Sequence, residues 1–173
     1  HRDAQCNEYY TKAYYNPNAT FDQRCTVLTT ITADSIAIWP DSTYQNFISA
    51  YPNEHVPLLC YGLTFYAKRD SSCYDYFRKS LEINPKQEEI WKNVISYYVT
   101  KNELDSTIAL CNQAVASYPN NSDFLFSLGF SYHSKGEDSL AIVTMKKSVD
   151  ACLAKRDAAG ASYIWGSIGF SKK

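Results

Sequence analysis

The chain has 173 residues and a formal net charge of −1, so its length suits one domain or one short array of repeats. The near-neutral charge gives no electrostatic reason to expect binding to nucleic acid or to an anionic membrane surface, because both need a clustered basic surface. Only six Gly and six Pro are present, so the turn density of an all-β sandwich is missing.

The N-terminal segment, residues 1–53, is predicted to contain helices and one divergent repeat. A first helix over residues 3–15 is expected to end at Asn16-Pro17, because the residue before a proline disfavours the helical conformation. A second helix is expected over residues 20–34. Its apolar residues recur at helical spacing, at Phe21, Cys25, Leu28 and Ile31.

A third helix is predicted from Asp41 to Tyr51, as the second helix of the divergent repeat. Tyr44 and Phe47 fall on the stripe of this helix that we expect to be buried. Pro40 stands where a helix interior would otherwise begin. Since proline breaks a helix interior, the sequence predicts a longer connection before this third helix.

From position 54 onward, the sequence repeats with a period of about 34 residues. Dipeptides that end in proline recur at close to this interval, at Tyr51-Pro52, Asn84-Pro85 and Tyr118-Pro119. Pairs of a small and an apolar residue recur at the same interval, at Ser80-Leu81, Ala114-Val115 and Ser148-Val149. The period predicts three repeats followed by the C-terminal helix of an incomplete one, with the bounds 54–87, 88–121, 122–155 and 156–173.

Each unit carries large apolar residues, small residues and a closing proline in a comparable order. The unit 122–155 shows this order best, with Leu125, Leu128, Gly129, Tyr132, Gly136, Ala141, Met145 and Ser148. The unit 88–121 follows with Trp91, Val94, Ile95, Tyr98, Thr107, Cys111, Ala114 and Pro119. The unit 54–87 is looser, with Cys60, Cys73, Phe77, Ser80 and Pro85. Its Gly62 sits one position late, which leaves the register of its first helix open.

This order resembles the tetratricopeptide repeat (TPR), in which Trp-x-x-Leu-Gly-x-x-Tyr lies on a first helix, small and aromatic residues lie on a second, and proline closes the unit. The resemblance covers residues 54–170 and, more loosely, 20–53. It implies an all-α protein, a right-handed superhelical α-solenoid of TPR helix-turn-helix repeats. Residues 162–173 resemble the first helix of a further unit, with Trp165, Ile168 and Gly169.

The amino-acid sequence of residues 154–169 also resembles a segment of the long TPR proteins of Bacteroidales, many of which are exported lipoproteins. This second resemblance implies a periplasmic or extracytoplasmic location, with the cytoplasm as the alternative. The first five residues are polar and show no signal peptide, and a signal peptide would therefore lie upstream of the chain.

Small residues are expected to bring the two helices of a unit close together, as Gly129 does against Ala141. Gly136 and Asn102 suit a tight turn with a left-handed backbone between the helices. Six cysteines are present, and none forms a C-x-x-C pair, which weakens a zinc or thioredoxin-like interpretation. Cys60 and Cys73 occupy nearly the same places in their unit as the small pair, so either a disulfide or two packed thiols fits the sequence.

In the TPR resemblance, first helices line the concave side of the stack, and five positions of each face its groove. The residues predicted to line a peptide-binding groove here are His55, Leu58, Phe65, Tyr66, Lys92, Ser96, Phe126, Phe130, His133 and Tyr163. Aromatic side chains with few charges suit an apolar or amphipathic helix, or an extended peptide. The alternative is that the N-terminal helix covers these aromatic residues or that they are scattered over the surface.

Some TPR proteins clamp a C-terminal carboxylate with Lys and Asn at fixed positions. Lys92 and Asn93 partly match this clamp, but its other positions hold Ser96, Phe126 and Ser127. The sequence therefore favours a groove of a different kind.

No catalytic residue, cofactor or metal is predicted. The three histidines lie in different units, and no P-loop, dinucleotide, zinc-protease or hydrolase motif occurs. The predicted function is a non-enzymatic scaffold that binds an unidentified protein or peptide, without nucleic acid and without a transmembrane segment. One alternative is a spacer of a longer repeat protein that self-associates as a homodimer through an exposed terminal helix. Another is an enzyme-associated module within residues 1–40.

Overall fold

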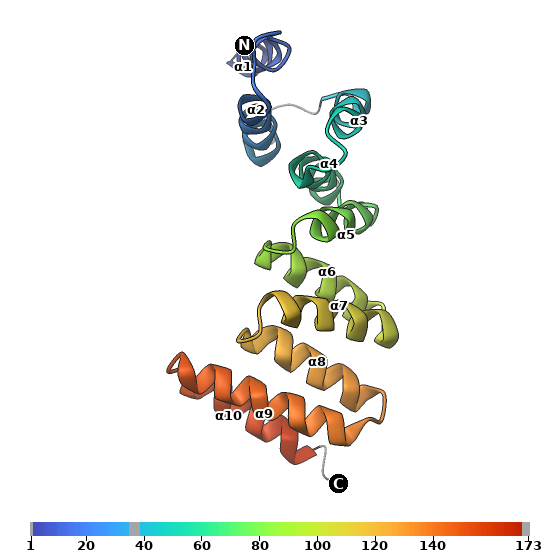
Figure 1. Cartoon of the computed structure of the whole chain (residues 1–173), viewed down its shortest axis with the longest axis vertical. Coiled ribbons are helices and arrows are strands. Elements are labelled where there is room, and N and C mark those ends of the chain that lie inside the picture. The colour runs from blue at the N-terminus through green and yellow to red at the C-terminus, as the bar shows by residue number, and fades with distance from the viewer. Residues whose placement is uncertain (1, 35–38, 171–173) are drawn as a thin grey trace. The chain divides into compact units, whose positions relative to one another are not determined.

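The computed structural model describes residues 2–34 and 39–170, and every regular element in these ranges is an α-helix (Figure 1). In chain order the helices are α1 (Arg2–Tyr14), α2 (Phe21–Asp34), α3 (Asp41–Ala50), α4 (His55–Ala67), α5 (Cys73–Ile83), α6 (Glu88–Thr100), α7 (Leu104–Ser117), α8 (Ser122–Ser134), α9 (Asp138–Ala154) and α10 (Ala158–Phe170). They form two compact units, His1–Asn84 and Pro85–Lys173, each with a buried cluster of its own.

The first two helices end and begin where the sequence predicts. α1 ends before Asn16-Pro17. α2 begins at Phe21 because Thr20 and Gln23 form a capping box. In this box, Thr20 N donates to Gln23 Oε1 at 2.9 Å, and Gln23 N donates to Thr20 Oγ1 at 3.3 Å. The two bonds satisfy backbone amides that no helical carbonyl can reach.

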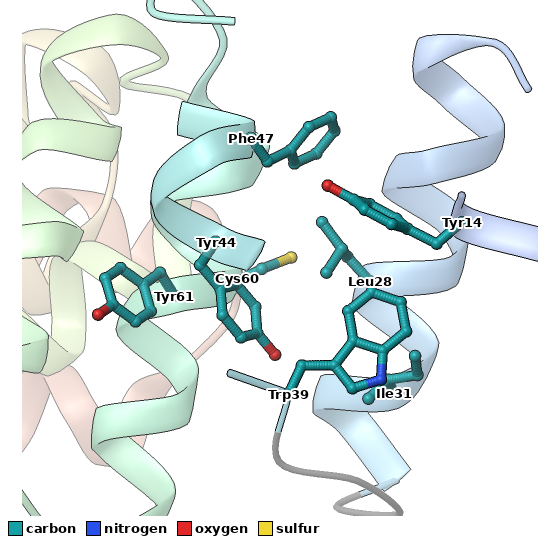
Figure 2. Packing of buried hydrophobic residues seen from close by; sticks show 8 residues of the cluster. All are labelled: Tyr14, Leu28, Ile31, Trp39, Tyr44, Phe47, Cys60 and Tyr61. Carbon is teal, nitrogen blue, oxygen red and sulfur yellow. The ribbon is translucent and has the colours of Figure 1, made fainter. Parts of the chain in front are cut away.

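Figure 2 shows the core of the first unit, to which α1, α2, α3 and α4 contribute side chains. Its buried members are Tyr14, Leu28, Ile31, Trp39, Tyr44, Phe47, Cys60 and Tyr61. The rings of Tyr44 and Tyr61 stack with their centroids 5.2 Å apart, and α2 and α3 both pack on α4. The buried stripes predicted for α2 and α3 are therefore confirmed. The longer connection predicted before Pro40 falls on residues 35–38, outside the described residues.

The hairpins α4–α5, α6–α7 and α8–α9 each turn through one residue with a left-handed backbone. These residues are Arg69 (φ 57°), Asn102 (φ 57°) and Gly136 (φ 83°). The amide that follows each of them donates to a carbonyl five residues back, from Asp70 to Phe65 at 3.0 Å, from Glu103 to Tyr98 at 3.2 Å and from Glu137 to Tyr132 at 2.9 Å. This bond closes the end of the first helix. The turns predicted at Asn102 and Gly136 are confirmed, and Arg69 adopts the same conformation without being Gly or Asn.

Glycine allows α8 and α9 to approach closely, as the sequence predicts. A Cβ atom added to Gly129 would lie 2.7 Å from Met145 Cγ and 3.2 Å from the carbonyl oxygen of Ala141. In α4, a Cβ atom added to Gly62 would lie 2.8 Å from the ring of Phe77 on α5. Since real Cβ contacts are longer than this, only glycine fits at these two positions without displacing a neighbour.

The spacing between glycine and turn settles the register of α4. Gly62 stands seven residues before Arg69, and Gly129 stands seven residues before Gly136. Gly62 is therefore the counterpart of Gly129, although the distance between them along the chain falls one position short of two full periods. It follows that every residue of α4 occupies a place in the repeat one position earlier than a uniform period implies.

The helix α10 differs from the prediction in its start and in its buried face. The TPR pattern places a first helix at residues 162–173, with Trp165 at the position of the motif's tryptophan. The helix begins at Ala158 instead, because Asp157 Oδ1 accepts a hydrogen bond from Gly160 N at 2.9 Å. Trp165 is 51% exposed. The residues of α10 that are buried are Ala161, Ile164 and Ile168.

Candidate protein-binding surface

Three aromatic side chains predicted for the groove lie together on α8 and α10. Phe126 and Phe130 are four residues apart and share one face of α8, with ring centroids 6.3 Å apart. The ring of Tyr163 on α10 lies 5.6 Å from that of Phe126. Phe130 is 48% and Tyr163 is 68% exposed, whereas Phe126 is half-buried. These three residues are called the aromatic surface below.

The helices that carry the aromatic surface are held in place by hydrogen bonds and by a buried cluster of the second unit. Asn121 caps α8, because its Oδ1 accepts from the amides of Asp123 at 3.0 Å and Phe124 at 3.2 Å. Its Nδ2 donates to Glu88 Oε1 at 2.9 Å, which ties the start of α8 to that of α6. Phe126 packs on a cluster that α9 and α10 share, composed of Met145, Val149, Cys152, Ala161, Ile164 and Ile168.

Lys92 is engaged with two carboxylates of its own helix. Its Nζ lies 3.0 Å from Glu89 Oε1 and 3.1 Å from Glu88 Oε1. Hydrogen bonds to Glu89 and Glu88 raise the pKa of the Lys92 amine. Because these partners already offset its charge, Lys92 is a poor anchor for a ligand carboxylate, which agrees with the clamp being disfavoured by the sequence.

The other polar residues predicted for the groove in this unit are His133 and Ser96. His133 Nδ1 lies 2.7 Å from Asp138 Oδ1, so the imidazole is oriented toward the start of α9. Ser96 is exposed on α6. Across the described ranges, His, Cys, Asp and Glu side chains do not gather into any group that could hold a metal ion.

In the first unit, Leu58 and Phe65 lie elsewhere than predicted. Leu58 is 8% exposed and lies between α3 and α5. The ring of Phe65 stacks on that of Tyr76 on α5, with centroids 5.5 Å and planes 4° apart. Both residues thus face second helices rather than an open first-helix face. The reason is the shifted register of α4, which makes Leu58 the counterpart of Leu125 and Phe65 that of Tyr132.

His55 and Tyr66 lie at opposite ends of α4. Tyr66 is exposed and its ring centroid lies 6.0 Å from that of Phe77. The carbonyl of His55 accepts a hydrogen bond from Ser80 Oγ at 3.2 Å, and its Nε2 lies 3.2 Å from Asn84 Nδ2. His55 therefore has a structural role, because these contacts join the start of α4 to the end of α5.

Two grooves that the sequence interpretation missed lie beside second helices. The Leu58 groove, of about 570 Å³, is formed by α3, α4 and α5, and its lining includes Ile48, Pro52, Leu58, Tyr61, Lys79 and Glu82. The Leu125 groove, of about 400 Å³, is formed by α8, α9 and the loop before α8, and its lining includes Pro119, Leu125, Lys147, Asp150 and Ala151. The signal that could have revealed both is a leucine at the place of the motif's tryptophan.

Cys60 and Cys73 are free, buried thiols, so of the two sequence interpretations the structure has packed thiols. Cys25, Cys111 and Cys152 are free as well. Burial raises the pKa of Cys60 and of Cys111 to about 12. Thiols with such pKa values carry almost no thiolate near neutral pH, which makes them unreactive as nucleophiles.

None of the described helices combines the length and apolar composition that crossing a bilayer requires. No known family model matches the chain, and no curated protein is similar to it in sequence.

Solved structures of similar fold do exist. YrrB, a TPR protein with an unusual peptide-binding site, aligns with a TM-score of 0.61 and 12% identity, over 94% of this chain and 91% of its own. Two structures of MamA align with TM-scores of 0.51 and 0.50 and identities of 17% and 19%. They cover 98% and 75% of this chain and 93% and 84% of their own. At such identities the likeness concerns the fold alone, and it confirms the predicted all-α solenoid of TPR-type hairpins.

Proposed function

We propose that this chain is a protein-interaction scaffold that binds a peptide or an amphipathic helix of a partner protein on the aromatic surface. The observation that carries the proposal is the pair of exposed rings, Phe130 and Tyr163, on a well-supported base. Adjacent exposed aromatic side chains on a folded domain are typical of protein-binding sites. YrrB, which shares the fold, is a TPR protein with a peptide-binding site, and this supports the same kind of ligand here.

The proposal makes the chain a binding module rather than an enzyme. Its support is that the sequence lacks catalytic motifs and that the thiols with strongly raised pKa values are buried. The proposed ligand therefore stays chemically unchanged and is released as it was bound. Ser96 and His133 of the second unit are proposed as polar flanks of the aromatic surface, and the experiment below addresses its two exposed rings.

Replacing Phe130 or Tyr163 with alanine is expected to weaken partner binding about tenfold, because exposed aromatic residues at the centre of an interface commonly contribute about 1–2 kcal/mol or more. Partners are first isolated by affinity capture from the native extract and identified by mass spectrometry. Their dissociation constants are then measured by calorimetry against each variant. Both side chains are largely exposed, so the midpoint of denaturation should stay unchanged.

Val143→Ala is the matched control, because Val143 is an exposed apolar residue on α9 and lies outside the aromatic surface. It should bind every partner as the unchanged chain does. If Phe130→Ala and Tyr163→Ala also bind every captured partner with unchanged affinity, the aromatic surface is not the binding site.

A second candidate function is a spacer that self-associates through α10. The observation in its favour is an open face of this helix, because Trp165 is exposed and Cβ atoms added to Gly166 or Gly169 would meet no described atom within 4 Å. Light scattering over a range of concentrations decides the matter. A dimer that Trp165→Ser abolishes would support the spacer, whereas a monomer at every concentration would rule it out.

We further propose an extracytoplasmic location, as in the exported Bacteroidales lipoproteins that residues 154–169 resemble. The amino-acid sequence of residues 154–169 is the only support for this location. Fractionation of native cells followed by immunodetection tests it, and recovery in the cytoplasmic fraction alone would contradict it.

A further inference from the structure

The two grooves occur at equivalent places in the repeats. The residue six positions after the closing proline is Leu58 after Pro52 and Leu125 after Pro119. In the intervening repeat the same place holds Trp91, six positions after Pro85. Trp91 is 2% exposed, and its Nε1 donates to the carbonyl of Pro85 at 2.9 Å. Where leucine replaces the indole, a groove lined by the proline and the leucine remains.

The lining of the Leu58 groove suits an aromatic ring. Ile48 and Leu58 provide aliphatic walls, and the rings of Tyr61 and Tyr76 meet at a centroid distance of 4.7 Å beside them. Aromatic pairs favour such offset and tilted contacts with a further ring. The volume of about 570 Å³ accommodates one large side chain together with part of its backbone.

Opposite charges three residues apart accompany each open groove. Lys79 and Glu82 line the Leu58 groove, and Lys147 and Asp150 line the Leu125 groove at the same spacing. In the repeat that carries Trp91, the corresponding residues of the second helix are Gln113 and Ala116, which are uncharged.

These four charges remain available to a ligand. No ion pair involving any of them is found in the described part of the chain, and the Lys79 amine lies 5.7 Å from the centroid of the Tyr76 ring. A ligand that offers one carboxylate and one cation would complement both members of each pair.

We propose that the Leu58 and Leu125 grooves bind a partner peptide whose aromatic side chain occupies the groove and whose flanking acidic and basic residues face Lys79 with Glu82, or Lys147 with Asp150. The chain's own Trp91 shows that this position in the repeat accepts an indole. The charge pairs select tryptophan or another large aromatic residue set between residues of opposite charge. This site involves neither Phe130 nor Tyr163. The proposal for the two grooves can therefore be tested independently of the proposal for the aromatic surface.

The test uses the acetylated and amidated pentapeptide Gly-Glu-Trp-Lys-Gly, followed by nuclear magnetic resonance of the isotope-labelled full chain. Saturable shifts are expected for the backbone amides around Ile48 and Lys79 and around Lys147. A peptide with alanine in place of tryptophan should lose at least tenfold in affinity, and one with serine in place of both charged residues should lose several-fold.

Leu58→Trp and Leu125→Trp together should fill both grooves and lower the affinity at least tenfold. Ala109→Trp is the matched control, since it adds an indole at an exposed position of α7, a helix that lines neither groove, and it should bind as the unchanged chain does. If the filled variant does not fold, Lys79→Ser with Glu82→Ser replaces it and should abolish the charge preference at the Leu58 groove.

Three results would overturn the proposal. The first is the lack of saturable shifts at several millimolar peptide. The second is a set of shifts confined to the neighbourhood of Phe130 and Tyr163, which would assign peptide binding to the aromatic surface alone. The third is equal binding of N-acetyltryptophanamide and the charged peptide, which would make the grooves sites for a small aromatic molecule.

Discussion

Trp91→Ala is expected to lower the free energy of unfolding by about 3–5 kcal/mol, the range for truncating a fully buried large aromatic side chain. Trp91 is almost completely buried in α6 and donates a hydrogen bond to the carbonyl of Pro85. Alanine removes the whole indole, and the flanking helices can close only part of the space. Denaturation by guanidinium chloride, followed by circular dichroism, measures the change.

Two further variants separate the cavity from other effects of losing a tryptophan. Trp165→Ala removes an exposed indole from α10 and should change the free energy of unfolding by no more than about 0.5 kcal/mol. Trp91→Leu introduces the residue that the two other repeats carry, and it should lie between alanine and tryptophan in stability. Equal losses for Trp91→Ala and Trp165→Ala would show that Trp91 does not fill a core position.

The period of the repeats could be predicted because local residues determine it. The second helices α3, α5 and α7 end shortly before Pro52, Pro85 and Pro119, and a left-handed residue such as Gly136 or Asn102 ends a first helix. These signals lie within a few residues of the boundaries that they create. The helix bounds, the hairpin turns and the close contact at Gly129 therefore follow from the sequence with little need for tertiary information.

The face of the helix on which a side chain lies depends on the register of the helix to within one residue, and the length of the repeat alone does not fix it. A shift of one residue rotates a side chain by about 100° around the helix axis. The single position by which Gly62 departs from the period was enough to move Leu58 and Phe65 from the expected groove to the side of the second helices. In α10, the helix begins four residues before the expected start, and Ala161, Ile164 and Ile168 are buried in place of Trp165.

The two kinds of candidate site differ in how visible they are in a sequence. Phe126, Phe130 and Tyr163 are large residues at expected first-helix positions, so their juxtaposition could be anticipated. The Leu58 and Leu125 grooves arise instead from a side chain that is smaller than the motif's tryptophan. The replacement of tryptophan by the smaller leucine can be recognised only by aligning the repeats with one another, and this alignment requires the register of α4.

Raising the pH from about 8 to about 10 is expected to lower the free energy of unfolding by about 3 kcal/mol through Cys60 and Cys111. Burial raises the pKa of each thiol from the ordinary value of 9.0 to about 12 in the folded chain. Both thiols remain protonated in the folded chain at about pH 10, whereas those of the unfolded chain ionise above 9. The unfolded state then binds fewer protons, so stability falls as the pH rises.

The size of the effect follows from the linkage between protonation and folding. Each thiol contributes about 1.4 kcal/mol for each pH unit above its unfolded pKa, as long as the folded pKa is not reached. Below pH 9 the contribution is fully present, and between about pH 9 and 12 it is progressively lost. Denaturation curves recorded in the presence of a reductant, at both pH values, measure the difference.

Lysine and tyrosine residues also titrate in this range, so a control must isolate the thiols. Cys60→Ala with Cys111→Ala will be less stable than the unchanged chain at every pH, because two buried side chains become smaller. Its loss of stability between about pH 8 and 10 should nevertheless be smaller by about 3 kcal/mol, since neither state retains these two thiols. Equal losses in the two proteins would mean that Cys60 and Cys111 ionise as readily in the folded chain as in the unfolded one.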